Sequence, residues 1–180
     1  MKVIFLDIDG VLNSSDWNEM HQDEIREGIL VDKDKVRLLG QIVRNTGARI
    51  VLHSGWKFWY DAQMKPLNIE AKRLEQLLEN EGTRIWGMTP DFTTEEIRKN
   101  RKFSLTKAKE ILEWLHKHLE VDAWIVLDDL DLHNEQIAVR QIRTDPKMGL
   151  TEEEAMRAEK MLNAGLEFFE KKGRVKKTDH

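Results

Sequence analysis

The segment MKVIFLDIDGVL, residues 1–12, decides the fold that this sequence predicts. It opens with an apolar, β-branched run that ends at Leu6, and a run without polar alternation is typical of a strand buried on both faces. The run then gives way to Asp7, Asp9 and Gly10. We therefore predict a central parallel strand that carries two carboxylates where it turns into a loop.

The rest of the chain alternates between strand-like and helix-like segments. Apolar runs predict further strands over 48–53, 84–88 and 123–127, and a fifth, less apolar strand over 136–143. Capping residues predict the helices: Asp32 precedes one that Gly47 ends, Pro66 is the first residue of one that Gly82 ends, Ser104 precedes one over 105–118, and Thr151 with Glu154 opens the last, which reaches Phe169. This alternation calls for an α/β fold, a Rossmann-like parallel sheet flanked by helices, with ligands at the carboxyl ends of its strands.

Composition and charge describe an ordinary globular protein and exclude several kinds of site. Of the 180 residues, 40% are hydrophobic and 34% are charged, and no repeat or low-complexity linker divides them, so we expect a single domain over residues 1–180. The absence of cysteine excludes disulfides, thiol nucleophiles and thiolate metal sites. The net charge of −4 gives no general attraction to nucleic acid. Because no run approaches the ~20 apolar residues that span a bilayer, we expect a cytoplasmic protein without membrane contact.

Two pairs of acidic residues follow two of the most apolar runs. Asp7 and Asp9 end the first strand, and Asp128 and Asp129 end the strand over 123–127. A carboxylate at a strand end can attack phosphorus while a second one transfers protons, although Asp before Gly is also common in turns. Because the ends of parallel strands share one edge, four carboxylates there need a cation to offset their repulsion, and Mg²⁺ suits such hard oxygen ligands. The alternative is an acidic, solvated loop.

Weaker signals come from a serine and from three lysines. Ser54 and Gly55 follow a predicted strand and offer a hydroxyl and backbone N–H groups to a phosphoryl oxygen, although Ser-Gly is more often a turn. Phosphoryl transfer also needs a fixed cation, and three lysines lie near the start of the helix over 105–118: Lys102, Lys107 and Lys109. A lysine in a first helical turn opposes the macrodipole, which gives Lys107 a reason to be present, but this reasoning leaves all three open.

Taken in order, four features of the chain resemble the haloacid dehalogenase (HAD) superfamily. They are Asp7-Ile8-Asp9-Gly10-Val11, Ser54 after a strand, a lysine on a helix, and Asp128-Asp129. The resemblance implies that Asp7 is the nucleophile, and that Asp9 is the general acid/base and offers its backbone carbonyl to Mg²⁺. It further implies that Ser54, with Gly55, binds the phosphoryl group and that Asp128 and Asp129 bind the metal.

The resemblance also narrows the branch of the superfamily and the choice of lysine. Dehalogenases and P-type ATPases lack an acid at the position of Asp9, so its presence implies a phosphatase or a phosphomutase. The segment 107–111, followed by Trp114-Leu115, is similar to a subgroup in which a lysine opens this helix, which favours Lys107. Together with Thr144-Asp145-Pro146 and Gly149-Leu150-Thr151, the chain most resembles the phosphatase-like domain of Swiss Army Knife RNA repair proteins.

Members of the superfamily differ mainly in the caps that cover their sites, and this sequence offers only short insertions near 13–31, 55–65 and 89–103. A minimal cap admits a large substrate, so the expected partner is a phosphorylated small molecule or a nucleic-acid end. Four aromatic residues of the insertions could stack a base or pack the insertions themselves: Trp17, Trp56, Trp59 and Tyr60. We expect a magnesium-dependent phosphatase that hydrolyses a phosphate monoester through an aspartyl phosphate. The alternatives are a phosphomutase and a non-catalytic HAD-like scaffold.

Overall fold

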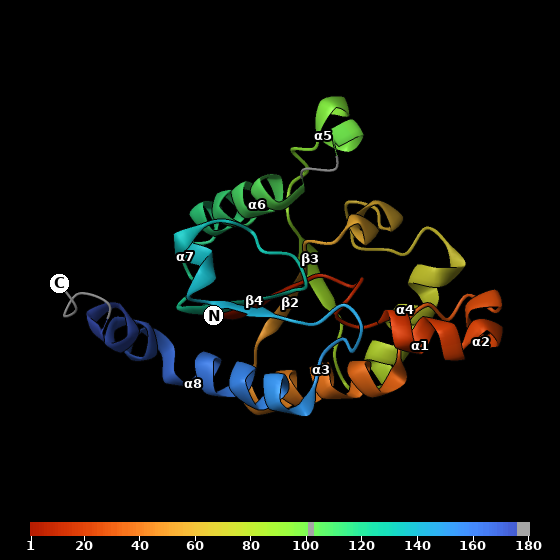
Figure 1. Ribbon diagram of the computed structural model, residues 1–180, viewed down its shortest axis with the longest axis horizontal. Helices are drawn as coiled ribbons and strands as arrows, with labels where there is room; N and C mark the ends of the chain where they lie inside the picture. Colours follow the sequence, from red (N-terminus) through yellow and green to blue (C-terminus); the bar gives the residue numbers. More distant parts are fainter. Residues whose placement is uncertain (101–102, 176–180) are drawn as a thin grey trace.

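A five-stranded parallel sheet forms the centre of the computed structural model, which describes residues 1–100 and 103–175 (Figure 1). Its strand order is β3-β2-β1-β4-β5, so the strand predicted as central lies in the middle of the sheet. The strands are β1 (Lys2–Leu6), β2 (Arg49–Leu52), β3 (Ile85–Met88), β4 (Ala123–Asp128) and β5 (Gln141–Arg143). The predicted α/β fold with a parallel sheet is therefore confirmed.

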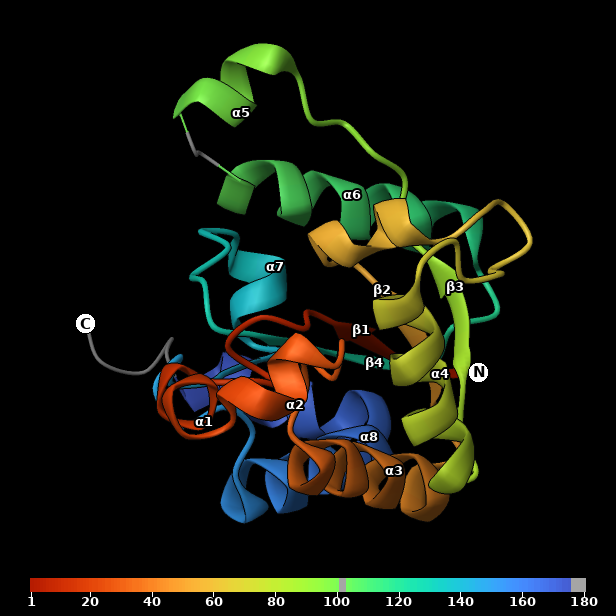
Figure 2. The same ribbon diagram turned by 90° about the vertical axis from the view of Figure 1, so that its right-hand side faces the viewer.

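Helices cover both faces of the sheet (Figures 1 and 2). One face packs against α3 (Lys33–Thr46), α4 (Ile69–Asn80) and α8 (Glu152–Val175), and the other against α6 (Phe103–Lys117) and α7 (Glu135–Ala138). Four fully buried residues of β1 divide between the two cores: Ile4 and Leu6 on the first face, Val3 and Phe5 on the second. Each such side chain contributes about 1.5–3 kcal/mol by burial, so the strand that bears the candidate site is firmly anchored.

Several helix ends follow the capping residues that the sequence predicted. Asp32 accepts a hydrogen bond from the backbone N–H of Asp34 at 2.9 Å, and Gly47 ends α3 in the left-handed conformation, at φ +69°. Thr151 and Glu154 form the predicted capping box: the N–H of Thr151 donates to Glu154 Oε2 at 2.9 Å, and the N–H of Glu154 donates to Thr151 Oγ1 at 3.3 Å. These predictions are confirmed.

Three predicted boundaries were wrong. Pro66 does not begin a helix, because it pairs with Tyr60 in an isolated antiparallel bridge, and α4 starts at Ile69 after Asn68 has capped it. The segment 136–143 is only partly a strand, because the side chain of Asn134 accepts from two following N–H groups and starts α7. Ser104 lies inside α6, which already includes Phe103.

Short helical elements lie in the described parts of the three expected insertions. Residues 13–31 contain α1 (Ser15–Met20) and α2 (Gln22–Arg26), residues 55–65 contain the 3-10 helix η1 (Gly55–Trp59), and residues 89–103 contain α5 (Glu95–Asn100). In Figure 1, α5 stands beyond α6, on the face of the sheet that α6 covers. No helix in the described part of the chain is long and apolar enough to cross a membrane.

Candidate active site

The register of the sheet aligns the ends of its three middle strands. Leu6 of β1 pairs with Leu52 of β2 and with Leu127 of β4. The next residue of each strand therefore lies at the same level: Asp7, His53 and Asp128. The N–H of Asp7 donates to the carbonyl of Leu127 at 2.9 Å, and the N–H of His53 donates to that of Leu6 at 3.0 Å.

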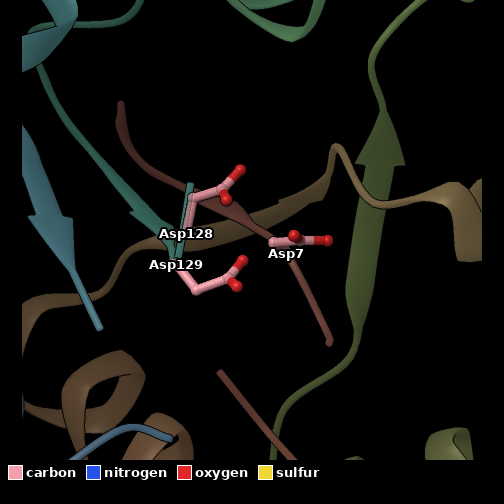
Figure 3. Close-up of side chains that lie close together, drawn as sticks. All are labelled: Asp7, Asp128 and Asp129. Carbon is pink, nitrogen blue, oxygen red and sulfur yellow. The ribbon is translucent and has the colours of Figure 1, made fainter. Parts of the chain in front are cut away.

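Asp7, Asp128 and Asp129 form a tight acidic cluster at this edge. Figure 3 shows the three side chains next to one another, and one oxygen of each lies within 4.8 Å of the others. Asp7 and Asp128 are buried, and Asp129 is half-buried. Gly10 makes room for the cluster, because a Cβ at this position would lie 2.7 Å from Cγ of Asp129, and the φ of +74° also favours glycine.

Lys107 supplies the cation at the cluster. Its Nζ donates to Asp7 Oδ2 at 2.7 Å and to Asp128 Oδ2 at 2.9 Å. Lys109, by contrast, is exposed and holds its ammonium 5.0 Å from the ring centroid of Phe92. Lys102 lies outside the described residues. Of the two candidate lysines that lie within the described residues, Lys107 is the one that α6 brings to the carboxylates.

Burial and charge perturb the ionisation of these groups. Burial disfavours the charge of Asp7, but Lys107 and the Ser54 hydroxyl outweigh it and hold the pKa of Asp7 below its usual value. Burial and the neighbouring Asp7 raise the pKa of Asp128 to about 7, against the opposing effect of Lys107. The same two causes raise the pKa of Asp129. A single lysine therefore does not fully offset three clustered carboxylates.

His53 is a neutral neighbour of the cluster. Its Nε2 lies 3.4 Å from Asp128 Oδ2, but burial and then the charge of Lys107 lower the pKa of His53 to about 3. The contact is therefore not an ion pair near neutral pH. His53 therefore adds no positive charge beside Asp128, which Lys107 contacts at 2.9 Å.

A divalent cation fits this donor set. The oxygens of Asp7, Asp128 and Asp129 are hard ligands from adjacent strand ends, and repulsion by Asp7, which together with burial raises the pKa of Asp128 and of Asp129, is what a bound cation would offset. Asp9 does not join these three carboxylates. Its carboxylate accepts hydrogen bonds from Asn13 and Trp56 instead.

A cavity of about 360 Å³ opens beside the cluster. Its lining includes five of the residues that the sequence singled out: Asp7, Asp9, Ser54, Gly55 and Lys107. Ser54 is buried, and its Oγ accepts from the N–H of Trp56 at 3.3 Å, which caps η1. Gly55 is exposed, so its backbone can approach a ligand.

Most of the aromatic side chains singled out in the insertions are buried in contacts within the protein. Trp17, Trp56 and Tyr60 are buried, Trp17 is stacked on His21, and Trp56 lies against Trp59. Of the two roles considered for these aromatic side chains, packing of the insertions is the one that the structure shows.

Two interactions at the site were missed by sequence reasoning. One joins Trp56 to Asp9, and the other is a buried ion pair of 2.8 Å between Lys57 and Glu110. Glu110 lies one helical turn after Lys107, so its inward direction could have been inferred from α6 periodicity. No comparable signal marked Lys57 or Trp56, because their partners are far away in the sequence.

Comparison with protein families shows which family the chain belongs to. The family model described as "HAD domain in Swiss Army Knife RNA repair proteins" matches residues 3–155. The matched range includes every candidate site residue, from Asp7 to Asp129. Searches of curated proteins and of solved structures found no match.

Proposed function

The chain belongs to the family of HAD domains of Swiss Army Knife RNA repair proteins, and on this premise we propose that it is a magnesium-dependent phosphatase that acts on phosphate monoesters. One observation carries the proposal. A buried carboxylate, Asp7, faces a cavity where Lys107 contacts it at 2.7 Å and where Asp9 provides a second carboxylate two residues away. A nucleophile, a cation and a proton donor for phosphoryl transfer therefore line one space.

In the proposed reaction, an oxygen of Asp7 attacks phosphorus, and the bond between phosphorus and the leaving oxygen breaks. Asp9 gives its proton to that oxygen and then takes one from a water molecule, which attacks the phosphorus of the aspartyl phosphate and breaks the bond between phosphorus and the Asp7 oxygen. Inorganic phosphate leaves, and both carboxylates return to their starting states. Lys107 and Ser54 hold the phosphoryl oxygens during both steps.

Asp7, Asp128 and Asp129 are the residues that would hold Mg²⁺, together with the backbone carbonyl of Asp9. When bound, the ion would offset the charge of these carboxylates and of the phosphoryl group. The proposal of a bound ion is supported by the acidic cluster, because Lys107 offsets the repulsion between its carboxylates only in part.

We further propose that the leaving group is the end of a nucleic acid. The RNA repair context of the family supports this substrate, and so do three residues of the cavity lining. They are Phe58, Phe103 and Arg98, and Phe58 is 52% exposed. Aromatic rings stack on bases of any sequence, and a guanidinium suits the next phosphodiester.

The decisive assay measures p-nitrophenol release from p-nitrophenyl phosphate with Mg²⁺ and with excess chelator. We expect turnover with Mg²⁺ only, and we expect Asp7→Asn to reduce it to background because an amide is a poor nucleophile. A sample of this variant must be free of deamidation back to aspartate. Near-normal turnover by Asp7→Asn would contradict the mechanism, and equal inactivity of both proteins on a broad ester panel would favour the non-catalytic scaffold.

The substrate is tested with the same phosphate on different leaving groups. We expect kcat/KM to be higher for an end-phosphorylated oligonucleotide than for glycerol phosphate, and Phe58→Ala to remove most of that preference without abolishing turnover of p-nitrophenyl phosphate. An oligonucleotide that is no better than glycerol phosphate would contradict the proposed substrate while leaving the phosphatase activity intact.

A further inference from the structure

Both carboxylate oxygens of Asp9 are held by side chains from elsewhere in the chain. Asn13 Nδ2 donates to Oδ1 at 2.9 Å, and the indole Nε1 of Trp56 donates to Oδ2 at 3.2 Å. Trp56 is 47 residues away in the sequence and belongs to η1, next to Ser54. The fold therefore joins the candidate proton-transfer group to the segment that carries the candidate phosphate-binding serine.

The two donor side chains, Asn13 and Trp56, are buried, whereas Asp9 is exposed. Asn13 is 7% exposed, and it also accepts from the N–H of Gly10 at 3.0 Å and donates to the carbonyl of Leu30 at 3.1 Å. Trp56 is 6% exposed, and its ring centroid lies 4.4 Å from that of Trp59 within the core that also contains α3 and α4. An exposed aspartate would otherwise sample several rotamers, so its orientation depends on these contacts.

We infer that Trp56 is a positioning residue for Asp9, and this inference rests on the proposed phosphatase function. Proton transfer needs the carboxyl oxygen within about 2.6–3.2 Å of the leaving oxygen. Each carboxylate oxygen has two lone pairs, so one N–H bond to each leaves a second lone pair for the proton. The indole N–H and the Asn13 amide thus keep Asp9 turned toward the cavity that it lines.

A purely structural role for Trp56 would affect different substrates in a different way from a positioning role. Trp56→Phe removes the N–H together with part of the buried indole ring, so if only packing mattered, the loss would be equal on all substrates. Loss of the N–H should instead matter in proportion to how much the leaving group needs a proton. An alkyl phosphate needs protonation as its ester bond breaks, whereas p-nitrophenolate leaves readily without it.

The test measures kcat and KM of wild type and Trp56→Phe on an alkyl phosphate and on p-nitrophenyl phosphate at saturating Mg²⁺. We expect kcat on the alkyl ester to fall about tenfold, a part of the ~10²–10⁴-fold that general acid–base catalysis contributes, and kcat on the aryl ester to fall less. The KM values should change little. Trp59→Phe is the matched control, because it makes the same change in the ring that packs against Trp56 and leaves the N–H bond to Asp9 in place, so the ratio of the two kcat values should stay as in wild type.

A double variant separates positioning of Asp9 from general damage. In an Asp9→Asn background, Trp56→Phe should cause no further selective loss on the alkyl ester, since the group that it positions is gone. Equal losses on both esters, or a selective loss that persists without Asp9, would overturn the role of Trp56 while leaving the phosphatase proposal standing. A wild type that is inactive on both esters would instead overturn the proposed function itself, and the inference with it.

Discussion

At the scale of single residues, Lys107 occupies the place that a metal ion would share. Its ammonium contacts Asp7 and Asp128, and these two carboxylates raise the pKa of Lys107 against the opposing effect of burial. A lysine in this position has two effects of opposite sign. In the proposed reaction it would stabilise charge on the phosphoryl group, and it would compete with Mg²⁺ for the same carboxylate oxygens.

Lys107→Met should separate these effects. We expect kcat on p-nitrophenyl phosphate to fall by about 10²–10³-fold, as when one electrostatic donor is lost from an active site. We expect Mg²⁺ affinity, measured by calorimetric titration, to stay equal or to increase, because a competing cation is gone. Lys109→Met should change neither quantity. A strong loss of Mg²⁺ binding in Lys107→Met would show that the lysine supports the metal site instead of competing with it.

At the scale of elements, local chemistry accounts for what the sequence predicted and what it missed. Asp32 and Thr151 were identifiable because a cap bonds to N–H groups two or three residues away. The prediction for Pro66 was wrong because proline at a first helical position and proline in a loop can have the same local sequence. The bridge between Pro66 and Tyr60 shows that this proline lies in a loop.

In the candidate site, too, some residues could be placed from the sequence and some contacts could not. Asp7, Ser54 and Asp128 could be grouped from sequence because each lies at or just after the end of an apolar run that predicts a strand, and ends of parallel strands share an edge. The contacts of Trp56 with Asp9 and of Lys57 with Glu110 join residues 47 and 53 positions apart, and both start from the short 3-10 helix η1. No periodicity or capping rule specifies such pairs, so they depend on the assembled fold.

The Lys57–Glu110 ion pair joins three elements. Lys57 Nζ donates to Glu110 Oε2 and to the carbonyl of Pro90, both at 2.8 Å, and Glu110 Oε1 accepts from the N–H of Phe92 at 2.8 Å. Both side chains are buried, at 6% and 2% exposure. The pair therefore ties η1 and α6 to the start of the segment that carries α5.

Breaking this pair should be costly. We expect Glu110→Gln to lower the free energy of unfolding by about 3–5 kcal/mol, because the charge of Lys57 would stay buried without its partner. Chemical denaturation measures the change. The double variant Lys57→Met/Glu110→Leu should recover most of the loss, since no charge is then buried, and Glu113→Gln, which alters an exposed pair with Lys117, should have no measurable effect. If Glu110→Gln left the free energy of unfolding unchanged, the ion pair would have to be solvated.

At the scale of the whole molecule, the sheet gathers negative charge at one edge. Three strand ends meet there because β1 lies between β2 and β4, and helices on both faces exclude water from the strands below (Figures 1 and 2). The folded chain alone holds Asp7, Asp128 and Asp129 together, since they are up to 122 positions apart in the sequence. A ligand of that cluster should therefore bind the folded state and not the unfolded chain.

Mg²⁺ should consequently raise the melting temperature. An ion present at a hundredfold excess over its Kd stabilises the folded state by ~2.7 kcal/mol, and for a chain of this size each kcal/mol raises Tm by ~2–4 °C. We expect a shift of about 5–10 °C in a thermal scan with Mg²⁺. NaCl at equal ionic strength should produce much less, because it screens the repulsion without binding the carboxylates. Asp128→Asn removes one of the three charges and should abolish most of the shift, whereas Asp131→Asn, outside the cluster, should retain it. An undiminished shift in Asp128→Asn would place the bound ion elsewhere on the protein.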